Sequence, residues 1–172
     1  MTIKTILTEP NEILRKVSRP VDKVGKDEKM LMDDMLETMY AANGIGLAAI
    51  QIGVPKRIIV MDLGRGDGKK DPRYFVNPVI KNKDSLKNIY EEGCLSVPNQ
   101  FAEIERPSKC DVEYLDYFGK KKILKAEGLL ATCIQHEMDH LEGILFIDYL
   151  SKLKKSMIVK KLSKLKSNTA IL

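Results

Sequence analysis

The sequence predicts an α+β fold in which antiparallel or mixed strands pack around a buried central helix, with an amphipathic helix at the C-terminus. Strand-like segments occupy much of the region between residues 57 and 126. They are followed over residues 128–141 by a helix whose first turns are apolar on nearly every side, which places it in the core. Strands that precede a buried helix are typical of α+β proteins and not of wound parallel sheets.

The N-terminal part of the chain is expected to be mainly helical. Residues 10–17 are typical of a short helix that Pro20 ends. A longer helix is predicted over residues 27–43, because apolar residues recur there at helical spacing. Residues 44–53 are rich in small side chains and are expected to form a tight connection that another element or a ligand can approach closely.

Four strands are expected in the middle of the chain, at residues 57–63, 75–80, 110–115 and 121–126. Residues 110–115 alternate apolar and polar side chains, as a half-buried strand does. Residues 121–126 follow a hairpin turn predicted over residues 117–120. Residues 90–98 are expected to be extended up to a turn at Pro98 and Asn99.

Composition predicts a single domain over residues 1–172 without a membrane segment. The chain is 44% apolar and 31% charged, which is ordinary for a globular protein. No apolar run approaches the roughly 18–20 residues needed to cross a bilayer. The N-terminus has no signal-type or transit-type segment, so we expect a cytoplasmic protein from a bacterium. Three cysteines are too few for a disulfide framework.

The two histidines of the chain, His136 and His140, lie four residues apart in the predicted central helix. Positions i and i+4 share one helix face, so both imidazoles can bind the same metal ion. Glu137 lies between them and is suited to act as general base for a metal-bound water. The alternative is a purely structural role, in which two core histidines are hydrogen-bonded and the glutamate between them has no catalytic function.

A third ligand has to come from a cysteine or a carboxylate, because no other histidine exists. Cys94 lies beside a glycine in an apolar extended segment and is favoured over Cys110 and Cys133. One thiolate and two imidazoles would leave the fourth tetrahedral position open, as in catalytic rather than structural zinc sites. The choice among the three cysteines stays open at this point.

Three segments together resemble the signature motifs of the peptide deformylases: residues 44–51, 92–96 and 135–140. They occur in the same order and at similar separations, and the likeness runs from about Leu14 to Tyr149. The resemblance implies an enzyme that removes the formyl group from N-formylmethionyl nascent peptides and releases formate. It also implies one divalent metal ion, Fe2+ in life, which Zn2+, Ni2+ or Co2+ can replace.

Roles for individual residues follow from the same resemblance. Cys94, His136 and His140 would bind the metal, and Glu137 would move the proton from water to the departing amine. The developing oxyanion would be stabilised by the side chain of Gln51 and the backbone N–H of Leu95. The substrate would be bound by Ile45, Gly46, Tyr90, Leu129 and Cys133. All of these except Gly46 would line an apolar slot for the methionine side chain, together with the face of His136.

Phe101 departs from the pattern of the family that this chain resembles, whereas Arg106 matches a frequent family position. Phe101 stands where such proteins often carry arginine, so we expect altered contacts to substrate beyond the methionine. Arg106 is expected to pair with Asp139 behind the metal ligands.

The C-terminal segment, residues 150–172, is basic and contains no acidic residue. Its apolar residues recur at helical spacing and its lysines would form the other face. One interpretation is a solvated lysine face above an apolar stripe that packs on the domain. The other is electrostatic docking to the ribosome, without sequence-specific recognition of nucleic acid.

Two competing functions are consistent with part of the pattern. A zinc-dependent protease shares the His-Glu-x-x-His motif. Such enzymes usually take their third metal ligand from a residue after the histidine helix, where this chain has no histidine. A homologue without activity that only binds ribosomes is disfavoured by the intact set of Gln51, Cys94 and Glu137.

Overall fold

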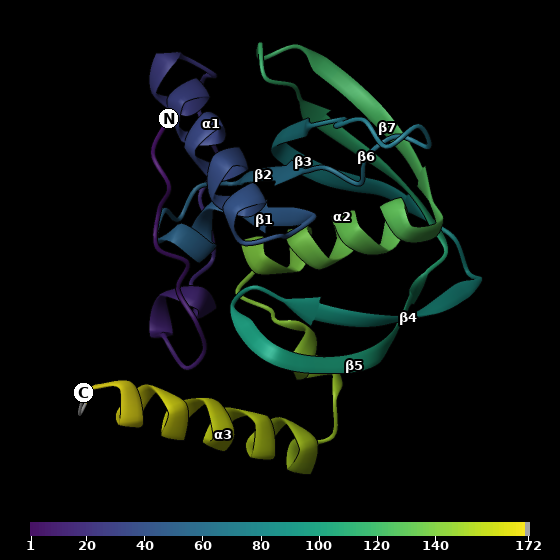
Figure 1. Cartoon of the computed structure of the whole chain (residues 1–172). Coiled ribbons are helices and arrows are strands. Elements are labelled where there is room, and N and C mark those ends of the chain that lie inside the picture. Colours follow the sequence, from purple (N-terminus) through teal and green to yellow (C-terminus); the bar gives the residue numbers. More distant parts are fainter. Residues whose placement is uncertain (171–172) are drawn as a thin grey trace.

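The computed structural model describes residues 1–170, with side chains described to residue 166, and shows two antiparallel sheets with one helix between them (Figure 1). The elements in chain order are η1 (Glu12–Arg15), α1 (Lys26–Ala41), β1 (Gly46–Ala48), η2 (Ala49–Ile52), β2 (Ile58–Met61), β3 (Arg73–Lys83), β4 (Lys87–Cys94), β5 (Val97–Pro107), β6 (Lys109–Leu115), β7 (Lys121–Glu127), α2 (Gly128–Leu141), η3 (Phe146–Tyr149) and α3 (Lys152–Ala170).

The larger sheet has five strands in the order β1-β2-β3-β6-β7, and β4 and β5 form a separate two-stranded sheet. Every strand pair in the described part of the chain is antiparallel. Helix α2 lies between the two sheets, so its two sides face different layers (Figure 1). This arrangement confirms the predicted α+β class with a buried central helix.

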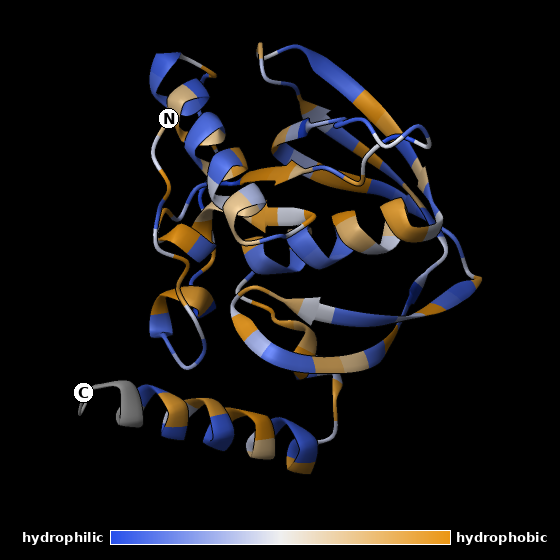
Figure 2. Cartoon of the chain, in the orientation of Figure 1, coloured by the Kyte–Doolittle hydropathy of each residue, from blue (hydrophilic) through white to orange (hydrophobic). Residues whose placement is uncertain are grey.

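Helix α2 is buried because its apolar side chains pack on the larger sheet and its other side is covered by β4 and β5. On the side of the larger sheet, Ile134 and Leu141 join a core cluster with Phe75 and Val112. Figure 2 shows the corresponding apolar bands on the inner strands and on the first turns of α2. Burial of each such side chain contributes about 1.5–3 kcal/mol, so this core fixes the orientation of the helix that carries the histidines.

Helix α1 covers the other end of the larger sheet through buried methionines at helical spacing, Met32, Met35 and Met39. It begins at Lys26, one residue before the predicted start, and the Glu28 carboxylate accepts a hydrogen bond of 3.0 Å from the Gly25 N–H at its N-terminus. Residues 10–17 contain only the short 3-10 helix η1.

The turn expected at Pro98 and Asn99 was wrong, because both residues belong to β5. The chain reverses at Leu95 and Ser96, where Cys94 pairs with Val97 across a bulge. Strand β5 itself was not predicted. In its hairpin with β4, Arg106 pairs with Asn88. The hairpin covers the side of α2 that faces away from the larger sheet (Figure 1).

Helix α3 follows β5 on the side away from α2 (Figure 1). Leu162 is 4% exposed and packs in a cluster with Val97 and Phe146, whereas Leu153 is 71% exposed and Met157 is 62% exposed. The predicted apolar stripe is therefore only partly packed on the body of the protein. Within residues 1–170, none of the helices combines the length and apolar character required to span a membrane.

Candidate metal centre and active-site cleft

Cys94, His136 and His140 converge on one point in the structure. Their possible ligand atoms all lie within 4.8 Å of one another, and no other group of this kind is found in the described part of the chain. The Cys94 Sγ atom is 3.4 Å from the His140 Nε2 atom, and the two imidazole centroids are 5.2 Å apart. Consecutive turns of α2 carry the histidines, and the end of β4 carries the cysteine.

The other two cysteines lie elsewhere. Cys110 is buried in the core cluster of the larger sheet, where burial raises the pKa of its thiol to about 11. Cys133 is 6% exposed and faces the cleft beside the cluster without joining it. The geometry thus favours Cys94 among the three candidates that the sequence left open.

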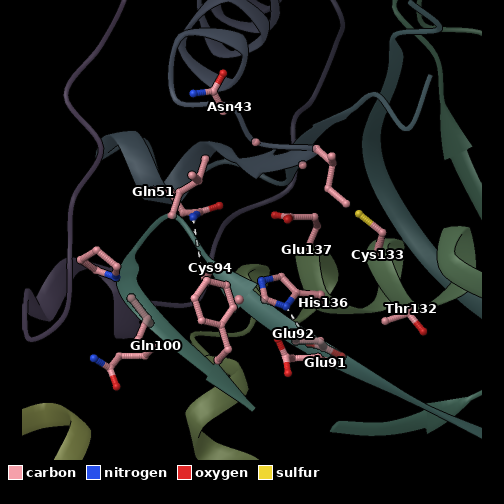
Figure 3. Close-up of a pocket in the computed structure, with 18 of the residues that line it drawn as sticks. Asn43, Gln51, Glu91, Glu92, Cys94, Gln100, Thr132, Cys133, His136 and Glu137 are labelled. Atoms are coloured by element: carbon pink, nitrogen blue, oxygen red, sulfur yellow. Dashed lines mark hydrogen bonds and ion pairs between the residues drawn. The ribbon is translucent and has the colours of Figure 1, made fainter. Parts of the chain in front are cut away.

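The donor set suits a divalent transition metal. A thiolate with two imidazoles is a known ligand combination for zinc, iron, cobalt or nickel. The Nδ1 atom of His136 is 2.8 Å from the Glu92 Oε1 atom, which leaves the Nε2 atom of the same ring free to act as a ligand (Figure 3). A carboxylate behind a ligating histidine fixes its tautomer and ring orientation in many metal sites.

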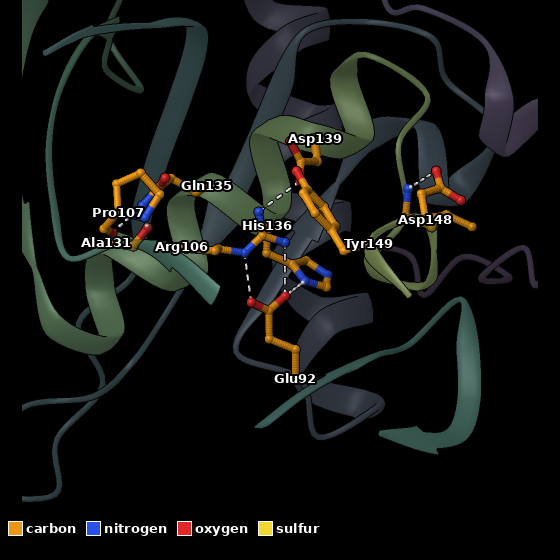
Figure 4. Close-up of polar contacts among 10 residues, drawn as sticks. Glu92, Arg106, Pro107, Ala131, Gln135, His136, Asp139, Asp148 and Tyr149 are labelled. Carbon is orange, nitrogen blue, oxygen red and sulfur yellow. Dashed lines mark hydrogen bonds and ion pairs between the residues drawn. The ribbon is translucent and has the colours of Figure 1, made fainter. Parts of the chain in front are cut away.

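Glu92 belongs to a hydrogen-bonded network behind His136, in which Glu92 and Arg106 are buried (Figure 4). Arg106 donates to Glu92 through Nε (2.7 Å) and Nη2 (3.0 Å), and to the Asp139 Oδ2 atom through Nη1 (2.8 Å). The Tyr149 hydroxyl donates to the same Asp139 oxygen at 2.7 Å. The predicted contact between Arg106 and Asp139 is confirmed. Glu92 lies in the motif of residues 92–96, but the sequence did not predict its contacts with His136 and Arg106.

The network sets the charges of its members. Burial alone would raise the pKa of Glu92, but hydrogen bonds from His136 and Arg106 and the charge of Arg106 lower it below its usual value. Burial likewise opposes the charge on Arg106, and Glu92 and Asp139 nevertheless raise its pKa. A carboxylate held ionised in this way stabilises a proton on the Nδ1 atom of His136.

Glu137 follows His136 on α2 and points into the cleft (Figure 3). Its side chain is buried, its Oε2 atom has no hydrogen-bond partner among the described residues, and burial raises its pKa to about 7. A Cβ atom at Gly46 would lie 2.6 Å from the Glu137 Oε1 atom. Gly46 is thus needed for the glutamate to occupy this position.

Gln51 is 1% exposed and is held by both ends of its amide. Its Oε1 atom accepts from the Ala48 N–H at 2.9 Å, and its Nε2 atom donates to the Ser96 Oγ atom at 3.0 Å. The same nitrogen lies 3.6 Å from the Cys94 Sγ atom. These contacts aim the amide donor at the metal cluster, next to Leu95, whose side chain packs against Gly44.

The cluster opens into a cleft of about 490 Å3. Ile45, Gly46, Leu129 and Cys133 line it as predicted, together with His136 and Glu137. Residues that line it without having been given a role in the sequence prediction include Thr132, Glu91 and Gln100.

Tyr90 is not among the residues that line this cleft, and its contact with the substrate stays a prediction. Tyr90 lies four residues before Cys94 on β4, a separation of roughly 13 Å along an extended strand. Its hydroxyl instead approaches the first residue of α2, where a Cβ atom at Gly128 would lie 3.8 Å from it. The sequence motif alone could not show this distance.

Comparison with known proteins agrees with this geometry. The family model described as polypeptide deformylase matches residues 3–156. The chain belongs to the polypeptide deformylase family. A protein from Pelagibacter ubique named peptide deformylase is 76% identical over 171 residues, which cover 99% of each chain.

Solved structures of the family share the fold. A peptide deformylase from Ehrlichia chaffeensis, in complex with actinonin, has a TM-score of 0.91 at 45% identity and covers 95% of this chain and 98% of its own. A class I type b peptide deformylase from Acinetobacter baumannii, bound to Met-Ala-Ser, has a TM-score of 0.81 at 31% identity and covers 87% of this chain and 99% of its own. The predicted family and enzyme class are thereby confirmed, and removal of the N-formyl group from nascent peptides follows from membership.

Proposed function

We propose that this deformylase is a metal-dependent hydrolase that cleaves the formyl group from the N-terminal formylmethionine of newly synthesised proteins and releases formate. The observation that carries this proposal is the convergence of Cys94, His136 and His140 beside the buried carboxylate of Glu137. We treat residues 1–172 as one domain and place it in the cytoplasm of a bacterium.

One divalent ion, Fe2+ in life, would be held by Cys94, His136 and His140. When bound, it supplies Lewis-acid chemistry that lowers the pKa of a coordinated water and polarises the formyl carbonyl. Glu92 supports this ligand set from behind, because its carboxylate accepts the Nδ1 proton of His136 and keeps the Nε2 atom unprotonated.

Glu137 carries the proton transfers. Its carboxylate accepts the proton from the attacking water and gives it to the nitrogen that leaves as the new N-terminus. The burial of Glu137 suits this role, since it brings the pKa of its carboxyl to about 7 and lets both protonation states exist near neutral pH. Neighbouring positive charge would favour the carboxylate form that is needed first.

Gln51 and Leu95 would stabilise the oxyanion that forms as water adds to the formyl carbon. The Gln51 amide is fixed by Ala48 and Ser96, so its donor is oriented before substrate arrives. Loss of one such donor costs about 3–4 kcal/mol of barrier in comparable enzymes. The backbone N–H of Leu95 would be the second donor.

The substrate would enter with its methionine side chain against Ile45, Leu129, Cys133 and the face of His136. Gly46 leaves room for a peptide backbone to run alongside β1 as an added strand. A relative that binds Met-Ala-Ser supports a tripeptide product at this cleft. Tyr90 would contact only a substrate that reaches the N-terminal end of α2.

The lysine-rich C-terminal helix would also dock the enzyme to the ribosome. Seven lysines lie between residues 152 and 166, and no acidic residue follows Asp148. Such a surface binds phosphates through a salt-dependent, sequence-independent attraction. Equal ribosome binding by the full chain and by a chain lacking residues 151–172 would contradict this part of the proposal.

A formate-release assay on formyl-Met-Ala-Ser, beside the unformylated tripeptide, tests the function. The proposal predicts formate from the first peptide and no cleavage of the second. Cleavage of a peptide bond in either substrate would indicate a protease instead. Neither product from metal-loaded protein would indicate a homologue without activity.

A further inference from the structure

A second hollow lies next to the active-site cleft, between β5 and α3. It has a volume of about 800 Å3. The residues that line it are Gln100, Phe101, Ala102, Glu103, Leu150, Lys154, Met157, Ile158, Lys160, Lys161 and Lys164. We call this hollow the α3 groove.

The α3 groove adjoins the active-site cleft. Gln100 and Phe101 line both hollows. The Phe101 ring lies against Gly93, where an added Cβ atom would be 2.6 Å from Phe101 Cε1, and Gly93 immediately precedes Cys94. A chain that leaves the cleft over Phe101 therefore enters the α3 groove within a short distance of the metal cluster.

The groove combines exposed apolar side chains with positive charge. Phe101 is 65% exposed and Met157 is 62% exposed, although α3 is anchored to the body by Leu162. Lys154 and Lys161 lie seven residues apart, two helical turns, and so share the face that also carries Met157. Figure 2 shows apolar and hydrophilic positions side by side along α3.

The charge of the groove is not neutralised within the protein. Among the residues the structure describes, Lys154 and Lys161 form no ion pair, whereas the neighbouring Lys155 is held by Asp148 at 2.7 Å. Glu103 is the one acidic residue in the lining, against four lysines. The groove therefore favours an extended, partly apolar chain that carries acidic side chains.

We propose that the α3 groove binds the segment of the substrate polypeptide that follows its first few residues, and that it favours acidic side chains there. This inference rests on the proposed function, because it extends the same substrate beyond the cleft. Phe101 and Met157 would contact the chain, and Lys154 and Lys161 would pair with its carboxylates. An extended peptide advances about 3.3 Å per residue, so a nonapeptide spans about 30 Å and continues well beyond the first three residues.

The test uses formylated nonapeptides that begin with formyl-Met-Ala-Ser and continue with six residues rich in Glu, Gln or Lys. The metal-loaded full chain should show kcat/KM values in the order Glu, Gln, Lys, with about threefold to tenfold between the first and second at low salt. Added salt should reduce this difference, because the lysines are exposed. The tripeptide formyl-Met-Ala-Ser carries no charged side chain for Lys154 or Lys161 to bind and should be insensitive to these changes.

A double variant, K154E with K161E, should reverse the order of the nonapeptides and leave the tripeptide unchanged. The matched control, K152E with K166E, makes the same charge change on α3 at exposed lysines outside the lining and should keep the original order. Equal kcat/KM for the three nonapeptides would overturn the groove proposal while tripeptide turnover still upholds the proposed function. Equal effects of the two double variants on the nonapeptides would also overturn it, since they would show that α3 acts only as a general polycation. An effect of the variants on RNA binding alone, with the order of the nonapeptides unchanged, would overturn it as well. Failure to turn over the tripeptide would instead overturn the proposed function and the groove proposal with it.

Discussion

Replacement of Arg106 by Met is expected to destabilise the protein more than any change at an exposed ion pair. The Arg106 side chain is 4% exposed, makes two hydrogen bonds to Glu92 and one to Asp139, and lies 5.0 Å from the centroid of the Tyr149 ring. The variant would leave the Glu92 carboxylate, also 4% exposed, without its cationic partner. Removal of one partner from a buried pair costs about 3–5 kcal/mol.

Urea unfolding followed by circular dichroism measures this loss, with a chelator present so that altered metal affinity does not enter the difference. The matched control is Lys109→Met, which breaks an ion pair to Glu127 whose side chains are 64% and 75% exposed. That variant is expected to lose less than about 0.5 kcal/mol. Adding Glu92→Gln to Arg106→Met should restore part of the stability, because it removes the uncompensated charge. A loss below about 1 kcal/mol for Arg106→Met, or no restoration, would refute the reasoning.

Three further predictions concern the cleft and the base of α3. Gly46→Ala should lower kcat on formyl-Met-Ala-Ser about 100-fold with little loss of stability, because its Cβ atom would displace Glu137; near-normal kcat would contradict this. Gln51→Ala should lower kcat by about 100–1,000-fold, measured as formate release in steady state, and an effect on KM alone would exclude an oxyanion role. Asp148→Asn should destabilise the protein at neutral pH, because burial opposes the charge of Asp148 but Arg15 lowers its pKa overall. A carboxyl with a lowered folded pKa stabilises above its unfolded pKa of about 3.9 and loses this contribution as pH falls through the folded pKa. Urea midpoints of parent and Asn variant should therefore converge in acid, and a difference independent of pH would count against the ion pair.

The central helix and the ligand pair were predictable because they depend on local spacing. Residues 128–141 form α2 with the predicted bounds, and helical periodicity alone places His136 beside His140. The thiolate ligand was narrowed to Cys94 by its motif, and the structure separates it from Cys133, which shares a helix with the histidines but only faces the cleft.

Strand β5 and the network behind the histidines could not be predicted in the same way. Val97–Pro107 contains prolines near both ends and exposed glutamates, and only pairing with β4 makes it a strand. The contact between Glu92 and Arg106 depends on the register of that hairpin, which is not encoded in local spacing. Helical periodicity also overstated the packing of α3, because periodicity cannot tell whether a neighbouring surface covers each turn.

The most direct test of the metal-dependent mechanism is metal content and activity per metal after anaerobic purification of the full chain. The account predicts one divalent ion per chain, Fe2+ as isolated, with formate release from formyl-Met-Ala-Ser proportional to bound metal. Cys94→Ala should lose both the metal and the activity. Full turnover by metal-free protein, or a Cys94→Ala variant that keeps its metal and its rate, would contradict it.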